Sequence, residues 1–204
     1  MNDTFSLTEL QLVLNHLKDY SPGIDGIPYS LLTHMGPTSK KYFLDIINCI
    51  YSTGAVPDDW KTHIIIPILK TGKDPSTATS YRPIAILSTL SKIMEHLVKN
   101  RLEWLLENRG ILPKSQFGFR KGLSTSDSPL ISNVTLAFSQ KNFLVGVFLD
   151  VCAAYDNVIL PLLRHKMHQL SIPVRITNFV SNLYSGRHVL VRVEGNFMPE
   201  SPSV

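Results

Sequence analysis

Hydrophobic residues recur at helical spacing along most of this 204-residue chain. The clearest stripe runs from 90 to 106, with lysine, glutamate and arginine on the opposite side and Gly110 as a stop. The same spacing predicts further helices at 5–19, 28–35, 38–53, 127–140, 159–169 and 173–184. Polar stretches rich in glycine, proline or serine predict loops at 21–28, 71–80 and 113–126.

Three shorter runs have the pattern of β-strands. The run at 62–70 contains Pro67, which indicates an edge strand or a bulge, and the run at 188–194 alternates between apolar and other residues. The third, 143–149, is uninterrupted, apolar, rich in β-branched and aromatic residues and short for a helix. It predicts a buried strand that ends at Asp150.

A carboxylate at the tip of a buried strand suggests a metal site. Asp150 would stand on a rigid support, where a divalent cation can be held with little reorganisation. The aromatic ring of Tyr155, five residues later, can fold back over whatever the cation binds. This is the geometry that a nucleotide polymerase needs.

The composition sets broad limits. With 44% hydrophobic and 18% charged residues, the chain is ordinary for a globular protein, and its net charge of +4 fits a polyanionic partner only weakly. The two cysteines are far apart, which favours a reducing compartment. The polar, acidic start and the absence of a run of roughly 20 apolar residues predict an intracellular protein of nucleus or cytoplasm, neither secreted nor in a membrane.

Five short motifs occur in an order that resembles the reverse transcriptase domain of non-LTR (LINE-like) retrotransposons of the jockey or mosquito-element sort. They are SPGIDGI (21–27), ILKTGKD (68–74), YRPI (81–84), QFGFR (116–120) and FLD followed by YDNV (148–158). Each motif alone is weak, but the five together span roughly 20–195. The alternative is an unrelated α/β domain that contains these strings by chance.

The resemblance implies an α+β fold, namely the fingers and partial palm of a right-hand polymerase. Residues 1–142 would form the fingers and 143–204 the first half of the palm, with an incomplete antiparallel sheet centred on 143–150 and flanked by helices. The activity implied is RNA-directed DNA polymerisation by two-metal nucleotidyl transfer with Mg²⁺. The implied partners are an RNA template, a DNA primer and deoxynucleoside triphosphates.

The resemblance also implies roles for single residues. Asp150 matches the family's first metal-binding carboxylate, and the backbone carbonyl of Val151 is a plausible extra ligand. Tyr155 occupies the gate position, where an aromatic ring excludes a ribose 2′-hydroxyl; many relatives carry Phe there. The structural alternatives are a capping or turn aspartate for Asp150 and simple core packing for Tyr155.

Basic residues of the fingers resemble those that grip the incoming triphosphate. Lys70 and Arg82 match these positions, and phosphate oxygens suit a bidentate arginine and a point-charge lysine. A structural ion pair is the alternative for Arg82, and Lys73 is close enough in sequence to replace Lys70. In the upstream motif, Asp25 is interpreted as an architectural turn residue that caps a backbone amide rather than as a catalyst.

A nucleic-acid strand is expected along the glycine-rich loop that follows the long helix. Aromatic and basic side chains alternate there, as nucleic-acid-binding loops require, and the candidates are Gln116, Phe119, Arg120 and Lys121. A solvated loop without this role is the alternative. His165 and His168 have a spacing that can bind metal, but no third ligand is near in sequence, so a partly exposed helix face is favoured.

The family pattern continues with a paired-aspartate hairpin that completes the metal site, and these 204 residues do not contain one. After Asp150 the acidic residues are Asp156, Glu194 and Glu200, none in such a context. One carboxylate cannot hold two Mg²⁺ ions against their preference for water. We therefore expect a fragment or degenerate copy of a larger protein that is inactive alone. The alternatives are a non-catalytic nucleic-acid-binding module and a pseudogene-derived remnant.

Overall fold

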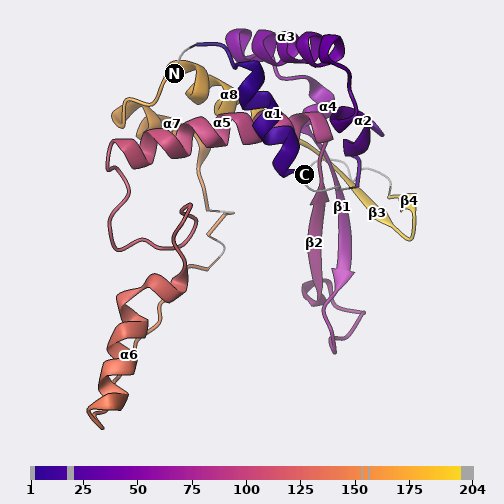
Figure 1. Ribbon diagram of the computed structural model, residues 1–204. Helices are drawn as coiled ribbons and strands as arrows, with labels where there is room; N and C mark the ends of the chain where they lie inside the picture. Colours follow the sequence, from indigo (N-terminus) through magenta and orange to yellow (C-terminus); the bar gives the residue numbers. More distant parts are fainter. Residues whose placement is uncertain (1–2, 18–20, 153, 156, 199–204) are drawn as a thin grey trace. The chain divides into compact units, whose positions relative to one another are not determined.

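The computed structural model describes residues 3–17, 21–152, 154–155 and 157–198 (Figure 1). Its contacts divide the chain into two compact units, and each is described here by itself. The first unit comprises residues 1–99 and 160–204, and the second comprises 100–159, so the division falls within one long helix. The predicted boundary between fingers and palm at 142/143 concerns subdomains of a polymerase and stays a prediction.

The first unit begins with three helices that the apolar periodicity predicted. Helix α1 (Leu7–His16) starts at Ser6, whose hydroxyl accepts a hydrogen bond from the Glu9 amide (3.2 Å) while the Glu9 carboxylate accepts one from the Ser6 amide (2.8 Å). After α2 (Tyr29–Thr33), helix α3 (Pro37–Thr53) ends at Gly54, which has a φ of 72°. The short α4 (Asp58–Lys61) leads into the sheet.

A four-stranded mixed sheet follows, in the order β2-β1-β3-β4. Its strands are β1 (Thr62–Leu69), β2 (Tyr81–Ile86), β3 (His188–Val193) and β4 (Asn196–Phe197), with a 3₁₀ turn, η1 (Ala78–Ser80), before β2. Strand β1 pairs antiparallel with β2 and parallel with β3. The α+β class is confirmed, but the expectation of an antiparallel sheet centred on 143–150 is wrong: the sheet is mixed and its inner strands are β1 and β3.

Two prolines face each other in the β1–β2 hairpin, Pro67 opposite Pro83. The Lys70 amide donates to the Ser80 carbonyl (2.8 Å), which makes 70/80 a hydrogen-bonded pair. Because hydrogen-bonded and non-hydrogen-bonded pairs alternate, 67/83 is a non-hydrogen-bonded pair whose amide positions point outward. Strand β1 is an inner strand and not the predicted edge strand, but its pairing with β3 ends at Ile65, so neither proline removes a donor from the sheet.

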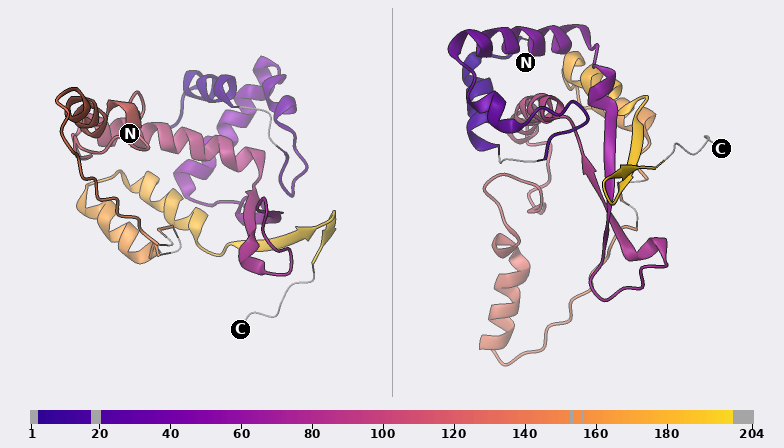
Figure 2. Two further views of the ribbon diagram at one scale, coloured as in Figure 1. Left: turned by 90° about the horizontal axis from the view of Figure 1, so that it is seen from below. Right: turned by 90° about the vertical axis from the view of Figure 1, so that its right-hand side faces the viewer.

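The core of the first unit lies among helices. Helix α5 (Thr89–Asn108) begins after Ser88, whose hydroxyl accepts hydrogen bonds from the amides of Leu90 and Ser91. Helices α7 (Leu160–Gln169) and α8 (Val174–Tyr184) lie side by side (Figure 2). The most deeply buried large side chains of the unit are Tyr51, Phe179, Leu10, Ile47, Ile93, Met94, Leu97 and Ile176. Within the described part of the chain, no helix combines the length and apolarity needed to cross a bilayer.

The second unit contains the last turns of α5, a loop with a 3₁₀ turn η2 (Thr125–Asp127), helix α6 (Pro129–Ser139) and a stretch up to residue 159 whose described residues, 140–152, 154–155 and 157–159, form no helix or strand. Helix α6 matches the predicted helix at 127–140, and Ser128 caps it by accepting from the Leu130 amide at 3.3 Å. None of the side chains of α6 is buried. The unit therefore has little core of its own.

The predicted buried strand at 143–149 does not form. These residues have no regular secondary structure, and their side chains are exposed: Phe143 is 101% and Leu149 93% exposed. A strand needs a neighbouring strand to satisfy its backbone groups, and none of the strands described pairs with this segment. An apolar sequence favours burial, but these side chains can be buried only where another part of the protein packs against them. Asp150 consequently does not stand on a strand tip.

Candidate functional site

The β1–β2 hairpin brings two predicted phosphate-binding cations to one face. The register places Arg82 opposite Ile68, and the Lys70–Ser80 hydrogen bond extends the ladder by one pair. Side chains two residues apart on a strand share a face, and so do directly opposite residues. Lys70 and Arg82 are therefore diagonal neighbours on the same face of the hairpin.

The two cations differ in how they are held. Arg82 is exposed, and no hydrogen bond or ion pair of its guanidinium is found among the described residues, which argues against the structural ion pair. The Lys70 ammonium donates to the Thr79 carbonyl at 2.8 Å. Lys73 is exposed in the adjoining turn, where Gly72 has a φ of 73°, so it remains an alternative to Lys70.

The loop at 21–28 is locked against the residues that follow β2. Asp25 Oδ1 accepts from the Ile27 amide (3.2 Å), and its Oδ2 accepts from the Ser88 hydroxyl (2.6 Å). Gly23 is buried so close to the backbone of Ser88 that a Cβ there would lie 2.5 Å from the Ser88 nitrogen. The interpretation of Asp25 as an architectural residue that caps a backbone amide is confirmed.

A partly buried charged cluster on α5 was not predicted. Glu95 accepts a hydrogen bond from the Ser91 hydroxyl (2.8 Å); burial raises its pKa, and that hydrogen bond and the charges of Arg187 and Lys92 oppose the rise. Burial in turn lowers the pKa of Lys92, against the opposing charges of Glu95 and Asp25. The sequence signal was weak, since these residues flank the apolar stripe of a long helix as any charged residue would.

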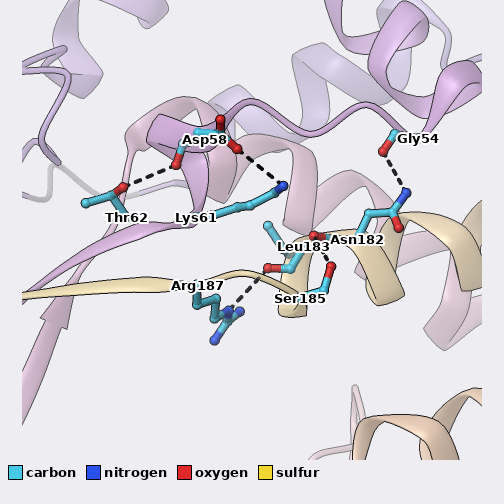
Figure 3. Close-up of polar contacts among 8 residues, drawn as sticks. All are labelled: Gly54, Asp58, Lys61, Thr62, Asn182, Leu183, Ser185 and Arg187. Atoms are coloured by element: carbon cyan, nitrogen blue, oxygen red, sulfur yellow. Dashed lines mark hydrogen bonds and ion pairs between the residues drawn. The ribbon is translucent and has the colours of Figure 1, made fainter. Parts of the chain in front are cut away.

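Arg187, just before β3, is held by two residues of α8. Its Nε donates to the Leu183 carbonyl (3.2 Å; Figure 3), and its guanidinium lies 3.9 Å from the centre of the Tyr184 ring. On β1, His63 is only 7% exposed, its Nε2 has no hydrogen-bond partner, and burial followed by the charge of Arg187 lowers its pKa. A buried imidazole with a lowered pKa and a guanidinium held by α8 thus lie at this end of the sheet.

In the second unit, Arg120 holds the 113–121 loop to the end of α5. Its Nε and Nη2 donate to the two carboxylate oxygens of Glu107 (2.7 and 2.5 Å), and its Nη1 donates to the carbonyls of Pro113 and Gln116. The hydrogen bond to Arg120 lowers the pKa of Glu107, and the same bond raises that of Arg120. Arg120 is therefore engaged within the chain, and its predicted contact with nucleic acid stays a prediction.

The loop that Arg120 holds presents an aromatic ring to solvent. Phe119 is 92% exposed and has a φ of 58°, a left-handed conformation that is unusual for a bulky residue. Lys121 is exposed beside it, whereas Gln116 is half-buried and donates from Nε2 to the Gly118 carbonyl at 3.3 Å. An exposed aromatic next to a cation, on a loop fixed by a bidentate ion pair, suits base stacking.

The predicted metal-binding residues lie in the irregular stretch of the second unit. Asp150, Val151 and Tyr155 are all exposed, Tyr155 by 80%. Asp150 and the Val151 carbonyl offer the hard oxygen donors that Mg²⁺ prefers, but among the described residues no three acidic, histidine or cysteine side chains group into a metal site. Their convergence with Lys70 and Arg82 of the first unit around one nucleotide remains a prediction.

Comparisons with known proteins agree on one family. The family model described as reverse transcriptase (RNA-dependent DNA polymerase) matches residues 68–200. The chain is 35% identical over 179 residues to a probable RNA-directed DNA polymerase from transposon BS of Drosophila melanogaster. It is also 33% identical over 177 residues to the RNA-directed DNA polymerase from mobile element jockey.

The two alignments cover 87% and 86% of this chain but only 20% and 19% of the relatives. The chain therefore spans about a fifth of the length of these curated relatives. The match includes the segments that contain Lys70, Arg82, Asp150 and Tyr155.

Proposed function

Because the chain belongs to the reverse transcriptase family, we propose that it supplies the nucleotide-binding fingers and the first metal-binding carboxylate of an RNA-directed DNA polymerase. The observation that supports this best is the family match over 68–200, which contains both cations of the hairpin and Asp150. The relatives are named as RNA-directed DNA polymerases of mobile elements. The substrates would be an RNA template, a DNA primer and deoxynucleoside triphosphates.

In this proposal the β1–β2 hairpin binds the triphosphate of the incoming nucleotide. Arg82 is exposed without a partner among the described residues, so its fork of N–H donors is available to phosphate oxygens. Lys70 needs only to exchange the Thr79 carbonyl for a phosphate oxygen. Because both lie on one face of a hydrogen-bonded hairpin, a single phosphate chain can contact them together.

Asp150 and the Val151 carbonyl would contribute oxygen ligands to Mg²⁺. Bound metal in such enzymes neutralises charge on the phosphates and activates the attacking hydroxyl. The donors here are of the right chemistry but too few for two ions, because Mg²⁺ keeps its water unless several carboxylates replace it. The 204-residue chain alone is therefore expected to be inactive, with the remaining ligands supplied by other parts of a longer protein.

Two further contacts complete the proposal. The ring of Tyr155 would lie under the sugar of the incoming nucleotide and exclude a 2′-hydroxyl. In the loop at 113–121, Phe119 would stack on a base of the nucleic acid and Lys121 would contact its backbone, while Arg120 fixes the loop through Glu107. The site of action would be inside the cell, in the nucleus or cytoplasm, where template and nucleotides are present.

The test is a chimera in which this chain replaces the matching segment of the jockey polymerase. We expect it to extend a DNA primer on RNA, whereas the 204-residue chain alone does not. Arg82→Gln should raise the KM for deoxynucleoside triphosphate at least tenfold with a smaller effect on kcat. Lys41→Gln removes an exposed cation from α3 and serves as the matched control.

Two outcomes would contradict the proposal. If the chimera binds primed RNA but never extends it, the non-catalytic nucleic-acid-binding alternative is correct. If Arg82→Gln and Lys41→Gln have equal effects on KM, the hairpin does not bind the triphosphate.

A further inference from the structure

Residues of α7 and α8 line an open cavity that the polymerase proposal does not use. Its volume is about 470 Å³, within the range of small-ligand sites. It is lined by Leu160, Pro161, Arg164, His165, His168, Ser181, Asn182 and Ser185. The α7 residues are spaced by one, three or four positions, as are the α8 residues, so each helix contributes one continuous face.

The ionisable side chains that line this cavity are all basic. Arg164, His165 and His168 line it, and neither α7 nor α8 contains an aspartate or glutamate. No acidic residue occurs in the sequence between Asp156 and Glu194. Within the described structure, Arg164 has no ion-pair partner. Helices α3 and α4, which also pack against α8, carry Asp45, Asp58, which pairs with Lys61, and Asp59, and none of these aspartates lines the cavity. The basic lining therefore favours an anion, and the Arg164 guanidinium is free to bind one.

The side of the cavity formed by α8 is held by hydrogen bonds and includes a hydroxyl group without a partner. The side-chain Nδ2 of Asn182 donates to the Gly54 carbonyl (2.8 Å), and the Ser185 hydroxyl donates to the backbone carbonyl of Asn182 (3.2 Å; Figure 3). The Ser181 hydroxyl oxygen, by contrast, is buried and has no hydrogen-bond partner. A buried hydroxyl without a partner is costly, and rotation of the Ser181 side chain toward the cavity would let an anion there satisfy it.

We propose that this cavity binds a phosphate group, held by Arg164, His165 and His168 from α7 and by the Ser181 hydroxyl from α8. A metal is less suited: the two histidines could supply nitrogen ligands, but no third ligand groups with them among the described residues. The volume leaves room for an organic part beside the phosphate, against Leu160 and Pro161. The proposal rests on the cavity alone and is independent of polymerase activity.

The test is a titration of the 204-residue chain with inorganic phosphate, adenosine 5′-monophosphate and adenosine at constant ionic strength. Binding is followed by calorimetry and by the imidazole C–H signals of His165 and His168 in NMR. We expect both phosphates to bind and shift these signals, and adenosine to leave them unchanged. A tighter complex with the nucleotide than with inorganic phosphate would place the organic part in the cavity, and equal affinities would restrict the site to the phosphate.

Three variants test the assignment. Arg164→Gln should weaken phosphate binding at least tenfold, and Ser181→Ala severalfold. Lys166→Gln removes the same charge from the same helix outside the cavity lining and should leave the affinity unchanged. Should Arg164→Gln fail to fold, His168→Gln takes its place with the same expectation. Equal losses in the Arg164 and Lys166 variants, or binding of adenosine as tight as that of its monophosphate, would overturn the proposal.

Discussion

Replacing Gly23 by alanine should destabilise the first unit, because there is no space for a Cβ at this position. The added carbon would lie 2.5 Å from the Ser88 nitrogen and 2.7 Å from the Leu87 carbonyl carbon, whereas ordinary contact begins at 3.4 Å. These neighbours are backbone atoms just before α5, so the loop itself must move by about 0.9 Å, the difference between 3.4 and 2.5 Å. That movement also strains the 2.6 Å hydrogen bond from Ser88 to Asp25.

Overpacking of this kind costs about 1–3 kcal/mol. With a urea dependence of about 2 kcal/mol per molar, the midpoint of unfolding should fall by about 0.5–1.5 M. Trp60 is 4% exposed in the first unit, so its fluorescence in a Trp104→Phe background reports unfolding of this unit.

Gly36→Ala is the matched control for Gly23→Ala. Gly36 precedes α3 with an ordinary φ of −67°, and nothing lies within 4 Å of the position of a Cβ. Its substitution should cost less than about 1 kcal/mol, as expected for a helix N-cap. Equal midpoints for the two variants would refute the close packing of the 21–28 loop against Ser88.

Three further predictions concern the core and two titrating groups. Phe179→Ala should cost about 3–5 kcal/mol in urea unfolding, because the ring is 1% exposed, whereas Phe138→Ala, 76% exposed, should change it by less than about 0.5 kcal/mol. Because burial lowers the pKa of His63 below 6.5, the contribution of His63 to the stability of the first unit should fall as the pH drops from 7 to 5. The raised pKa of Glu95 contributes with the opposite sign in both proteins, so the comparison is made between wild type and His63→Gln. The stability of wild type relative to His63→Gln should fall over this range, and a difference independent of pH would contradict the prediction. The hydrogen bond from Arg120 lowers the pKa of Glu107 below 4.5, so the ion pair is complete above that pH and is lost as the pH falls through the lowered value. The Nε–H signal of Arg120 in NMR should follow this loss and should be absent in Glu107→Gln. A signal that changes neither with pH nor with the substitution would refute the pair.

Helices and their ends were the most predictable part of the fold. The apolar spacing of α3 and α5 and the stop signal at Gly110, which has a positive φ, were sufficient because a helix satisfies its backbone within itself. Strands were less predictable. Residues 81–86 form β2 although only a family motif was recognised there, since Arg82 and Pro83 obscure the alternation.

The strand predicted at 143–149 is absent because strands depend on partners outside their own sequence. An apolar β-prone run specifies a strand only when another strand is available, and the sequence of the run does not contain that information. The site shows a similar limit. Arg82 and Phe119 could be selected from local chemistry, but the bidentate pairing of Arg120 with Glu107 and the cluster around Glu95 depend on contacts between distant segments.

The central claim is that this chain contributes the first metal-binding carboxylate of a polymerase. The most direct measurement is the single-turnover rate of primer extension on RNA by the jockey chimera with Asp150→Ala. The matched control is Asp45→Ala, which removes an exposed carboxylate from α3. We expect the Asp150 variant to bind primed RNA normally and to lose extension by at least a thousandfold, with the Asp45 variant unchanged. Extension at the unmodified rate by Asp150→Ala would contradict the claim.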